Sequence, residues 1–188
     1  LLVAPVSLRK GMEQLIRREI EHAQQGRGGS IKAKMNSLVD PGIIALLYEA
    51  SQAGVTIQLI IRGMCSLYPG LENMSDNISV VSIIGRFLEH SRIFWFNNGG
   101  EPEVFIGSAD LMPRNLDRRV EAVVPIEEPE LRAQLERLLE RYLSDNMGAW
   151  DMQPDGSFIQ RHPEGEERNS QLQLIDDWKG SALVQPNL

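Results

Sequence analysis

The sequence of 188 residues contains a single cysteine, Cys65, and no apolar run approaching the roughly 18 residues of a membrane span. One cysteine excludes an internal disulfide framework and a metal cluster of cysteines, and we expect Cys65 to be a small buried residue. The sequence also lacks a basic-then-apolar leader, so neither secretion nor a membrane span is indicated. We therefore expect a cytoplasmic protein, with peripheral association with a membrane left open.

The chain also lacks an excess of positive charge, since 26 acidic residues outnumber 19 basic residues. The acid is concentrated in residues 121–188, which carry fourteen acidic and six basic side chains, whereas residues 31–120 carry nine and eight. No basic face with interleaved aromatic residues stands out, so nucleic acid is not a favoured partner. The middle of the chain is close to neutral, and its basic side chains are available for local contacts with anions.

Hydrophobic residues make up 42% of the chain, enough for a full core, and a single α/β domain with extensions is expected. Residues 1–25 predict a helix that Ser7 opens. The alternation over residues 31–36 predicts a strand that places Lys32, Lys34 and Asn36 on one face. Asp40-Pro41 predicts the start of a second helix. Residues 55–61 are almost continuously apolar, which is typical of a central strand buried on both faces.

Further strands are predicted over residues 78–84, 90–96, 103–108 and 120–126. Asn97-Asn-Gly-Gly100 is a strong hairpin signal, so the strands on either side of it are expected to be antiparallel neighbours. A helix is predicted from Pro129, with core residues along one face: Leu131, Leu135, Leu138, Leu139 and Tyr142. We expect residues 1–146 to form the domain and residues 147–188 a polar extension, packed on the domain or partly disordered.

One region concentrates side chains suited to a phosphate. It comprises Phe87-Leu-Glu-His90-Ser-Arg92, Gly107-Ser-Ala-Asp110 and Arg114-Asn-Leu-Asp-Arg-Arg119-Val-Glu121. An imidazole can attack phosphorus or carry a proton, and the guanidinium fork of Arg92, Arg114 or Arg119 matches phosphate oxygens. If residues 90–96 form a strand, His90 and Arg92 share a face. Ser108 and Asn115 would add uncharged donors.

Two more candidates lie at predicted strand ends. Arg62 directly follows the predicted central strand, and Asn36 ends the first strand. Ligands of open α/β sheets gather beyond the carboxyl ends of strands, so both could join His90. In the structural alternative, Lys34 and Asn36 only solvate a strand end. The arginine-rich turn would then be a solvated loop that pairs with Asp110, Asp117 and Glu121.

The order His-x-Arg, a hydrophobic strand, Gly-Ser-Ala-Asp, then Asn115 and Glu121 resembles the histidine motif of the phospholipase D superfamily. That motif usually has lysine where this chain has Arg92. The chain is more similar to polyphosphate kinase of the first type, whose second carboxy-terminal phospholipase-D-like domain it resembles along nearly its whole length. Six runs in the same order carry the resemblance: Leu1-Leu-Val-Ala-Pro5, Arg18-Glu-Ile-Glu-His22-Ala, Lys34-Met-Asn-Ser-Leu-Val-Asp40, Arg62-Gly-Met-Cys-Ser66, Phe87-Leu-Glu-His-Ser-Arg92 and Ser108-Ala-Asp-Leu-Met-Pro-Arg-Asn-Leu-Asp-Arg-Arg119.

The resemblance implies a phospholipase D-like α/β sandwich, with a mixed β-sheet flanked by helices. It also implies an enzyme that reversibly moves the terminal phosphate of ATP onto inorganic polyphosphate, through a phosphohistidine and with Mg²⁺. The phosphorylated histidine is expected in a preceding domain, so we expect this chain to be a fragment, inactive alone and homo-oligomeric when full length. Substrate phosphates are expected to hold the magnesium, because no carboxylate cluster in the sequence resembles a dedicated cage.

In this hypothesis His90 assists as an acid or base, and Arg62 and Arg92 hold phosphates. Ser108, Arg114, Asn115 and Arg119 complete the pocket, while Asp117 and Glu121 orient His90 or the arginines. Two rival functions remain at this point. One is a phospholipase-D-like phosphodiesterase or nuclease half-site, and the other is a non-catalytic module that binds an anion.

Overall fold

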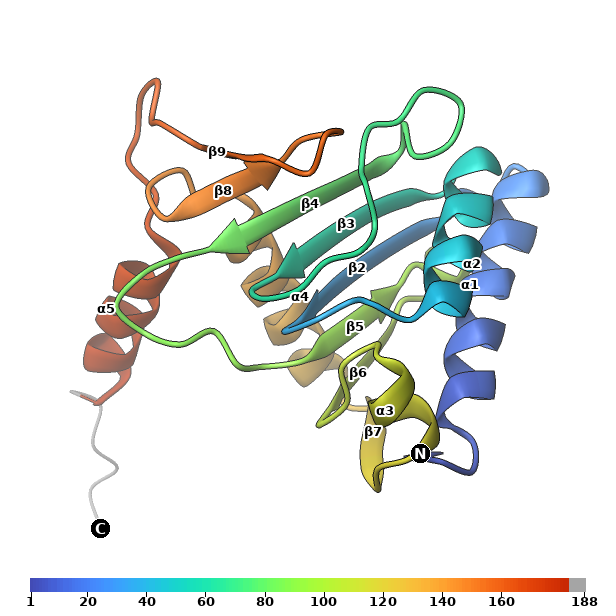
Figure 1. Ribbon diagram of the computed structural model, residues 1–188. Coiled ribbons are helices and arrows are strands. Elements are labelled where there is room, and N and C mark those ends of the chain that lie inside the picture. Colours follow the sequence, from blue (N-terminus) through green and yellow to red (C-terminus); the bar gives the residue numbers. More distant parts are fainter. Residues whose placement is uncertain (183–188) are drawn as a thin grey trace, which may run out of the picture.

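The strands within residues 1–182, the part of the chain that the structure describes, join one nine-stranded sheet in this computed structural model (Figure 1). The order across the sheet is β1-β7-β6-β5-β2-β3-β4-β8-β9. β2, β3 and β4 are parallel, and the remaining neighbours are antiparallel, so the sheet is mixed as expected. The strand bounds are β1 Leu2–Ala4, β2 Ser30–Met35, β3 Thr56–Ile61, β4 Ile78–Ile83, β5 Ile93–Phe96, β6 Glu103–Gly107, β7 Glu121–Ile126, β8 Ala149–Met152 and β9 Phe158–Gln160.

The apolar run at residues 55–61 becomes β3, which lies between two parallel neighbours. Ile57 and Leu59 pack into the core on one face of the sheet, and Ile60 packs into a separate core on the other face. Each of the three is at most 2% exposed. The prediction of a central strand buried on both faces is confirmed.

Helices cover both faces of this central region (Figure 1). α1 (Leu8–Gln24) and α2 (Pro41–Gln52) pack against the face that contains Ile31 and Met35. α4 (Pro129–Leu143) covers the opposite face, where Lys32 pairs with Glu136 at 3.7 Å. As predicted, Asp40 caps α2, since its side chain accepts a hydrogen bond from the Ile43 amide at 3.0 Å.

β5 and β6 form the antiparallel hairpin that the Asn-Gly signal predicts. At the turn, Asn98 and Gly99 have positive φ angles of 47° and 65°, the conformation that these residue types favour. The predicted strand over residues 90–96 was too long, however, because β5 begins at Ile93 and residues 84–92 form an irregular loop. The ladder stops there because Ile93 pairs with Lys34, and β2 ends one residue later at Met35.

The polar residues after 146 contain elements that the sequence pattern did not predict. β8 pairs with β4, β9 pairs with β8, and α5 (Ser170–Ala182) lies at the same end of the sheet (Figure 1). Asp145 fixes the start of α5, because its carboxylate accepts from the backbone amide and the hydroxyl of Ser170, both at 2.7 Å. The division of the chain at residue 146 stays a prediction, but β8 and β9 extend the same sheet.

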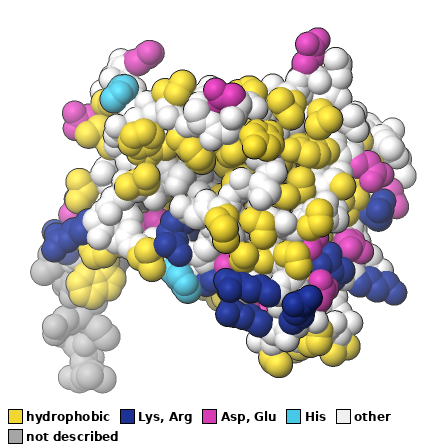
Figure 2. Space-filling model, in the orientation of Figure 1, with side chains coloured by type: hydrophobic (Ala, Val, Ile, Leu, Met, Phe, Trp, Pro, Cys, Tyr) yellow, Lys and Arg dark blue, Asp and Glu magenta, His cyan; other side chains and the backbone are white. Residues whose placement is uncertain are grey.

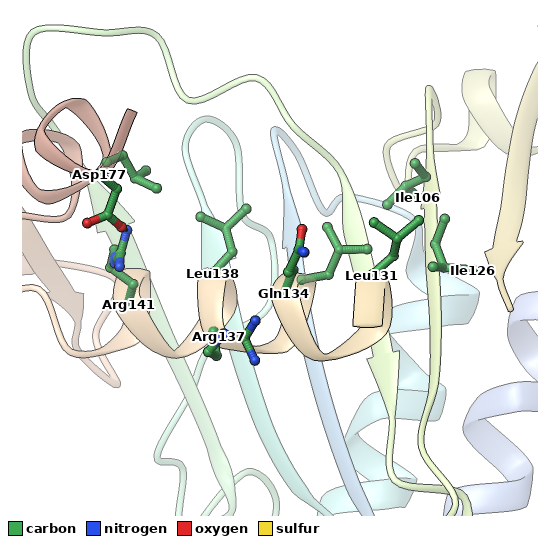
Figure 3. Close-up of a pocket in the computed structure, with 10 residues that line it drawn as sticks. Ile106, Ile126, Leu131, Gln134, Arg137, Leu138, Arg141 and Asp177 are labelled. Atoms are coloured by element: carbon green, nitrogen blue, oxygen red, sulfur yellow. The ribbon is translucent and has the colours of Figure 1, made fainter. Parts of the chain in front are cut away.

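The expected core face of α4 is only partly buried. Leu139 and Tyr142 are buried, whereas Leu131 is 48% exposed, so its prediction as a core residue was wrong. A groove of about 510 Å³ lies along α4, between its side chains, those of α5 and the ends of β6 and β7. Figure 3 shows Leu131 of α4 in this groove opposite Ile106 and Ile126.

Cys65 and the helices bear on two expectations from the sequence, the burial of the single cysteine and the lack of a membrane span. Cys65 is partly rather than fully buried, and its Sγ atom lies 3.4 Å from the Leu67 carbonyl oxygen. Burial raises the pKa of this thiol. None of the helices within residues 1–182 is both long and apolar enough to cross a membrane.

Candidate active site at one edge of the sheet

Four segments that carry polar side chains meet at one edge of the sheet. Because β2 and β3 are parallel, Asn36 and Arg62 follow their strands at the same edge. β5 is antiparallel to β2, and β6 is antiparallel to β5, so Arg92 before β5 and Asp110 after β6 lie there too. This edge is the carboxyl end of the parallel strands, where open α/β sheets bind ligands. Figure 2 shows Lys and Arg side chains gathered in the lower part of the view, beside a histidine.

Asp110 is the centre of the hydrogen bonds at this edge and is only 6% exposed. Its carboxylate accepts from the backbone N and the Nδ2 of Asn36, at 2.8 and 3.2 Å. Nε and Nη2 of Arg92 donate to its two oxygens, each at 3.2 Å, and this forked pair fixes the guanidinium plane. Sequence reasoning missed this role and treated Asp110 only as a partner in a solvated loop. The only nearby sequence feature that could have indicated this role is the position of Asp110 at the end of Gly107-Ser-Ala-Asp110.

His90 is exposed and lies in the 84–92 loop, so the expectation that strand alternation aligns it with Arg92 was wrong. The two side chains meet by another route. Nη1 of Arg92 lies 3.1 Å from Nδ1 of His90 and donates to the His90 carbonyl oxygen at 3.0 Å. A guanidinium group can only donate, so Nδ1 is the acceptor and the neutral ring carries its proton on Nε2. The nitrogen left for a ligand is therefore a donor.

Arg62 joins this cluster from the end of β3. Its Nε donates to Oδ1 of Asn36 at 3.0 Å, so the two ends of the Asn36 amide link Arg62 to Asp110. The structure thus draws Asn36 into the candidate site rather than leaving it at a solvated strand end. Two guanidinium groups and one carboxylate leave one net positive charge beside His90. Spare guanidinium donors with that charge suit an anion such as a phosphate.

Ser108, Asn115 and Glu121 form a second cluster next to the first. Glu121 is 7% exposed and accepts hydrogen bonds from the Ser108 hydroxyl and from Nδ2 of Asn115, the latter at 2.7 Å. Ser108 lies two residues before Asp110, and the Gly107 amide donates to the Arg92 carbonyl oxygen at 3.3 Å, so the two clusters share one segment. Glu121 therefore orients Ser108 and Asn115, rather than His90 or the arginines.

Asp117 does not reach His90 or any of the arginines predicted for the site. Both of its carboxylate oxygens accept from Arg9 of α1, at 2.7 and 2.6 Å. Arg9 also binds Asp40 through a second forked pair, at 2.9 and 2.6 Å. The predicted orienting role of Asp117 is corrected to one that ties α3 (Pro113–Asp117) to α1 and α2. No local pattern reveals this pair, because its members are 108 residues apart.

Arg114 and Arg119 lie on α3 and directly after it, and both are exposed. Neither side chain forms an ion pair with another residue of the described range 1–182. Their Nη and Nε donors point to no carboxylate of the cluster. Their predicted part in a phosphate pocket stays a prediction.

Lys34 is withdrawn from the surface, contrary to its expected availability for anions. Its side chain is 1% exposed, and its Nζ lies 3.3 Å from Oε2 of Glu89 and 5.0 Å from the centre of the Tyr142 ring. Burial lowers the pKa of the Lys34 amine, although Glu89 opposes that change. Burial and then the Glu89 carboxylate raise the pKa of Tyr142. A buried pair therefore lies directly behind His90, the neighbour of Glu89 in sequence.

The sequence model of the family described as polyphosphate kinase C-terminal domain 2 matches residues 1–172. The chain belongs to this family. The polyphosphate kinase of Parasynechococcus marenigrum (strain WH8102) is 77% identical over 180 residues, which are 95% of this chain and 25% of that protein. The crystal structure of polyphosphate kinase from Porphyromonas gingivalis matches 98% of this chain and 28% of its own, with 40% identity and a TM-score of 0.93. The chain thus spans about a quarter of the length of these relatives.

The fold of this polyphosphate kinase domain is also that of the phospholipase D family. The crystal structure of a phospholipase D family member, Nuc from Salmonella typhimurium, matches 81% of this chain and 95% of its own, with a TM-score of 0.59. The identity is 17%, so the likeness concerns the fold alone. The expected phospholipase D-like fold, a mixed sheet flanked by helices, is confirmed.

The two buried carboxylates of the candidate site, Asp110 and Glu121, already accept hydrogen bonds from other side chains. Asp110 accepts from Arg92 and Asn36, and Glu121 accepts from Ser108 and Asn115. Within residues 1–182 no three His, Cys, Asp or Glu side chains are grouped so that they could hold a metal ion. The residues of the site therefore do not fit a magnesium cage provided by this domain.

Proposed function

We propose that this chain supplies one wall of the active site of a polyphosphate kinase, which reversibly transfers the terminal phosphate of ATP to inorganic polyphosphate. The observation that carries the proposal is the linked set Arg62–Asn36–Asp110–Arg92–His90 at the carboxyl edge of a sheet in a domain of this family. Phosphoryl transfer is catalysed mainly by positioning and by neutralising charge, which is what this set offers.

In this proposal Arg62 and Arg92 bind phosphate oxygens of ATP or of the polymer. Asp110 and Asn36 hold the two guanidinium groups in place, so that little reorganisation is needed when an anion arrives. The Nε2–H of His90 donates a hydrogen bond to the oxygen that leaves phosphorus and stabilises the negative charge that develops there, while the neutral ring keeps its proton.

The remaining predicted residues lie around this centre. Glu121 holds Ser108 and Asn115 as uncharged donors, and Arg114 and Arg119 are exposed where they can meet a long polyanion. The nucleophile, a histidine that becomes phosphorylated, is proposed to come from the rest of the polypeptide. Magnesium is proposed to enter with the phosphates of ATP, as part of the substrate. Assembly of the full-length enzyme into a homo-oligomer, its cytoplasmic location and a peripheral membrane association stay predictions.

Phosphorus NMR of the full-length protein tests the proposal. With Mg²⁺ and ATP the wild type should build the signal of internal polyphosphate units, and His90→Ala should lose most of it. His162→Ala is the matched control, because His162 is an exposed histidine in the loop between β9 and α5. Polymer at equal rates in all three proteins would remove His90 from the mechanism.

Two further outcomes separate the rival functions. Absence of polymer in the wild type, combined with hydrolysis of a phosphodiester, would favour the phosphodiesterase. Binding of phosphate or sulfate without either reaction would reduce the cluster to an anion-binding module.

A further inference from the structure

The loop of residues 84–92, which carries His90 and precedes β5, is attached to a helix from the other end of the chain. Gln171, in the first turn of α5, is 5% exposed and uses both ends of its amide on this loop. Its Oε1 accepts from the Phe87 amide at 2.9 Å, and its Nε2 donates to the Phe87 carbonyl oxygen at 2.9 Å. The side chain thus holds the loop backbone as a neighbouring strand would.

Glu89 continues this connection into the sheet. Its Oε1 accepts from Nε2 of Gln171 at 2.7 Å, and its Oε2 pairs with Nζ of Lys34. Lys34 lies two residues before Asn36 on β2, and its Nζ is also 3.5 Å from the Ser91 carbonyl oxygen. The two loop residues that flank His90 are therefore tied to the core through a buried amine and a buried amide.

The apolar side chains of the loop add little to these contacts. Phe87 and Leu88 are 50% and 67% exposed, so their burial contributes little to the position of the loop. α5 itself is well fixed, because Asp145 is 1% exposed and accepts both the Ser170 amide and its hydroxyl. A fixed helix start that binds the loop through a buried side chain is suited to setting the position of that loop.

We propose that Gln171 and Glu89 form a latch through which α5 sets the position of His90 for phosphoryl transfer. The inference rests on the proposed function. Gln171 and Glu89 are positioning residues in it, since their bonds end on the loop and on Lys34 rather than on a substrate. The position of the His90 imidazole depends on the latch because Glu89 directly precedes His90 in the chain.

Gly85 offers a way to open the latch without changing either member. A Cβ atom at Gly85 would lie 2.5 Å from Oε1 of Gln171 and 2.8 Å from its Cδ. The atoms in the way are the far end of a flexible side chain, so Gly85→Ala should push the amide aside and leave the fold intact. Gly165→Ala is the matched control, because a Cβ there meets nothing within 4 Å.

Steady-state kinetics of the full-length enzyme measure the effect. Gln171→Met keeps the volume of the side chain and removes the amide, and we expect a loss of about tenfold or more in kcat with a smaller change in KM for ATP. Gly85→Ala should show a loss in the same direction. Gln173→Met, on the same helix without a side-chain bond to the loop, and Gly165→Ala should behave as wild type.

A double-mutant cycle separates positioning from a merely structural role. If Gln171 acts through His90, Gln171→Met should cause little further loss of kcat in a His90→Ala background. Equal losses in both backgrounds, or unchanged kcat in both Gln171→Met and Gly85→Ala, would overturn the latch.

Hydrogen exchange keeps this test independent of the kinase proposal. The Phe87 amide, which donates to Gln171, should exchange faster in Gln171→Met and Gly85→Ala than in their controls, whether or not the protein makes polyphosphate. Unchanged exchange at Phe87 would refute the latch even in an active enzyme. Faster exchange in a protein without kinase activity would leave the contact standing and reject only the function assigned to it.

Discussion

Arg9 and Arg92 each hold a buried aspartate with a forked pair of hydrogen bonds, but they differ in the charge of the groups around them. Arg9 binds a second carboxylate as well, so that Asp40 and Asp117 engage its Nε and both Nη atoms. Arg92 binds the single carboxylate of Asp110 and turns its remaining nitrogen to a histidine.

The charge balance of the two clusters follows from this difference. Three carboxylates around Arg9, those of Asp40, Asp117 and, at 3.9 Å, Glu13, leave a net charge of −2, whereas Arg62 and Arg92 around Asp110 leave +1. An incoming phosphate is repelled by the first arrangement and attracted by the second. The number of carboxylates around an arginine thus distinguishes one that joins helices from one that can bind an anion.

Removal of a site arginine should produce the largest effect and is the most direct test of that contrast. Arg62→Ala removes an exposed guanidinium group whose one hydrogen bond to a described residue goes to Asn36. We expect kcat/KM for ATP in the full-length enzyme to fall about 10²–10³-fold because charge stabilisation is lost, and Tm to fall only modestly because Oδ1 of Asn36 is the one buried atom that loses its donor. Steady-state kinetics and thermal unfolding measure the two quantities.

Arg27→Ala serves as the control for this prediction, since Arg27 is an exposed arginine in the turn after α1. Its kinetics should match wild type. A loss in Arg62→Ala no greater than that of the control would place the phosphates elsewhere.

The opposite behaviour is expected of Arg9→Met. The substitution leaves Asp40, whose side chain is 2% exposed, without its guanidinium partner, and it releases α3 from α1. We expect a loss of about 2–3 kcal/mol in the free energy of unfolding, less than for a fully buried pair because Arg9 is itself 30% exposed. Urea unfolding of the 188-residue chain, followed by tryptophan fluorescence, measures it.

Arg17→Met is the matched substitution on the same helix. Arg17 pairs with Glu49 at 3.6 Å, with both side chains more than half exposed, and its loss should cost at most about 0.5 kcal/mol. Equal losses in the two variants would mean that the Arg9 cluster does not fasten the fold.

The residues that could be predicted from the sequence are those whose signal is local. A continuous apolar run placed Arg62 at a strand end, alternation placed Asn36 at another, and an Asn-Gly turn returned the chain toward the same edge. These patterns depend on backbone periods and turn conformations, which a few neighbouring residues determine. The edge of the sheet where the candidate site lies was therefore predictable.

The partners of the charged side chains were not predictable in the same way. Glu89 and Gln171 are 82 positions apart, and Arg9 and Asp117 are 108 positions apart. Neither pair produces a periodic pattern in the sequence. The start of β5 was also misjudged, because the predicted strand began at residue 90, three residues before Ile93. Long-range pairing of polar groups depends on tertiary packing, which propensity does not encode.

Arg92→Lys should have a smaller effect than removal of Arg62 and tests whether the fork matters. Lysine keeps the charge, and the related histidine motif usually contains it, but one ammonium group cannot bind both Asp110 oxygens and Nδ1 of His90 in the same geometry. We expect kcat in the full-length enzyme to fall about tenfold. Arg27→Lys is the control, and unchanged kcat in Arg92→Lys would show that charge alone suffices.

The smallest expected effect is a pH dependence in the Arg9 cluster. Burial raises the pKa of Asp40, but hydrogen bonds from Arg9 and the Ile43 amide outweigh it and hold the pKa below its ordinary value of 3.8. The folded state therefore binds this proton less readily than the unfolded chain. The stabilisation is complete above pH 3.8 and is lost as the pH falls through the lower folded value.

Asp40→Asn isolates this contribution, because asparagine still caps a helix but carries no charge. At pH 7 the variant should be less stable than wild type by about 1 kcal/mol, a modest value since Arg9 is partly solvated. The difference should persist to about pH 5 and shrink as the wild-type carboxyl becomes protonated below its ordinary value. Urea unfolding at a series of pH values measures it. A difference that stays constant down to pH 3 would mean that the cap, and not the charge facing Arg9, is what Asp40 contributes.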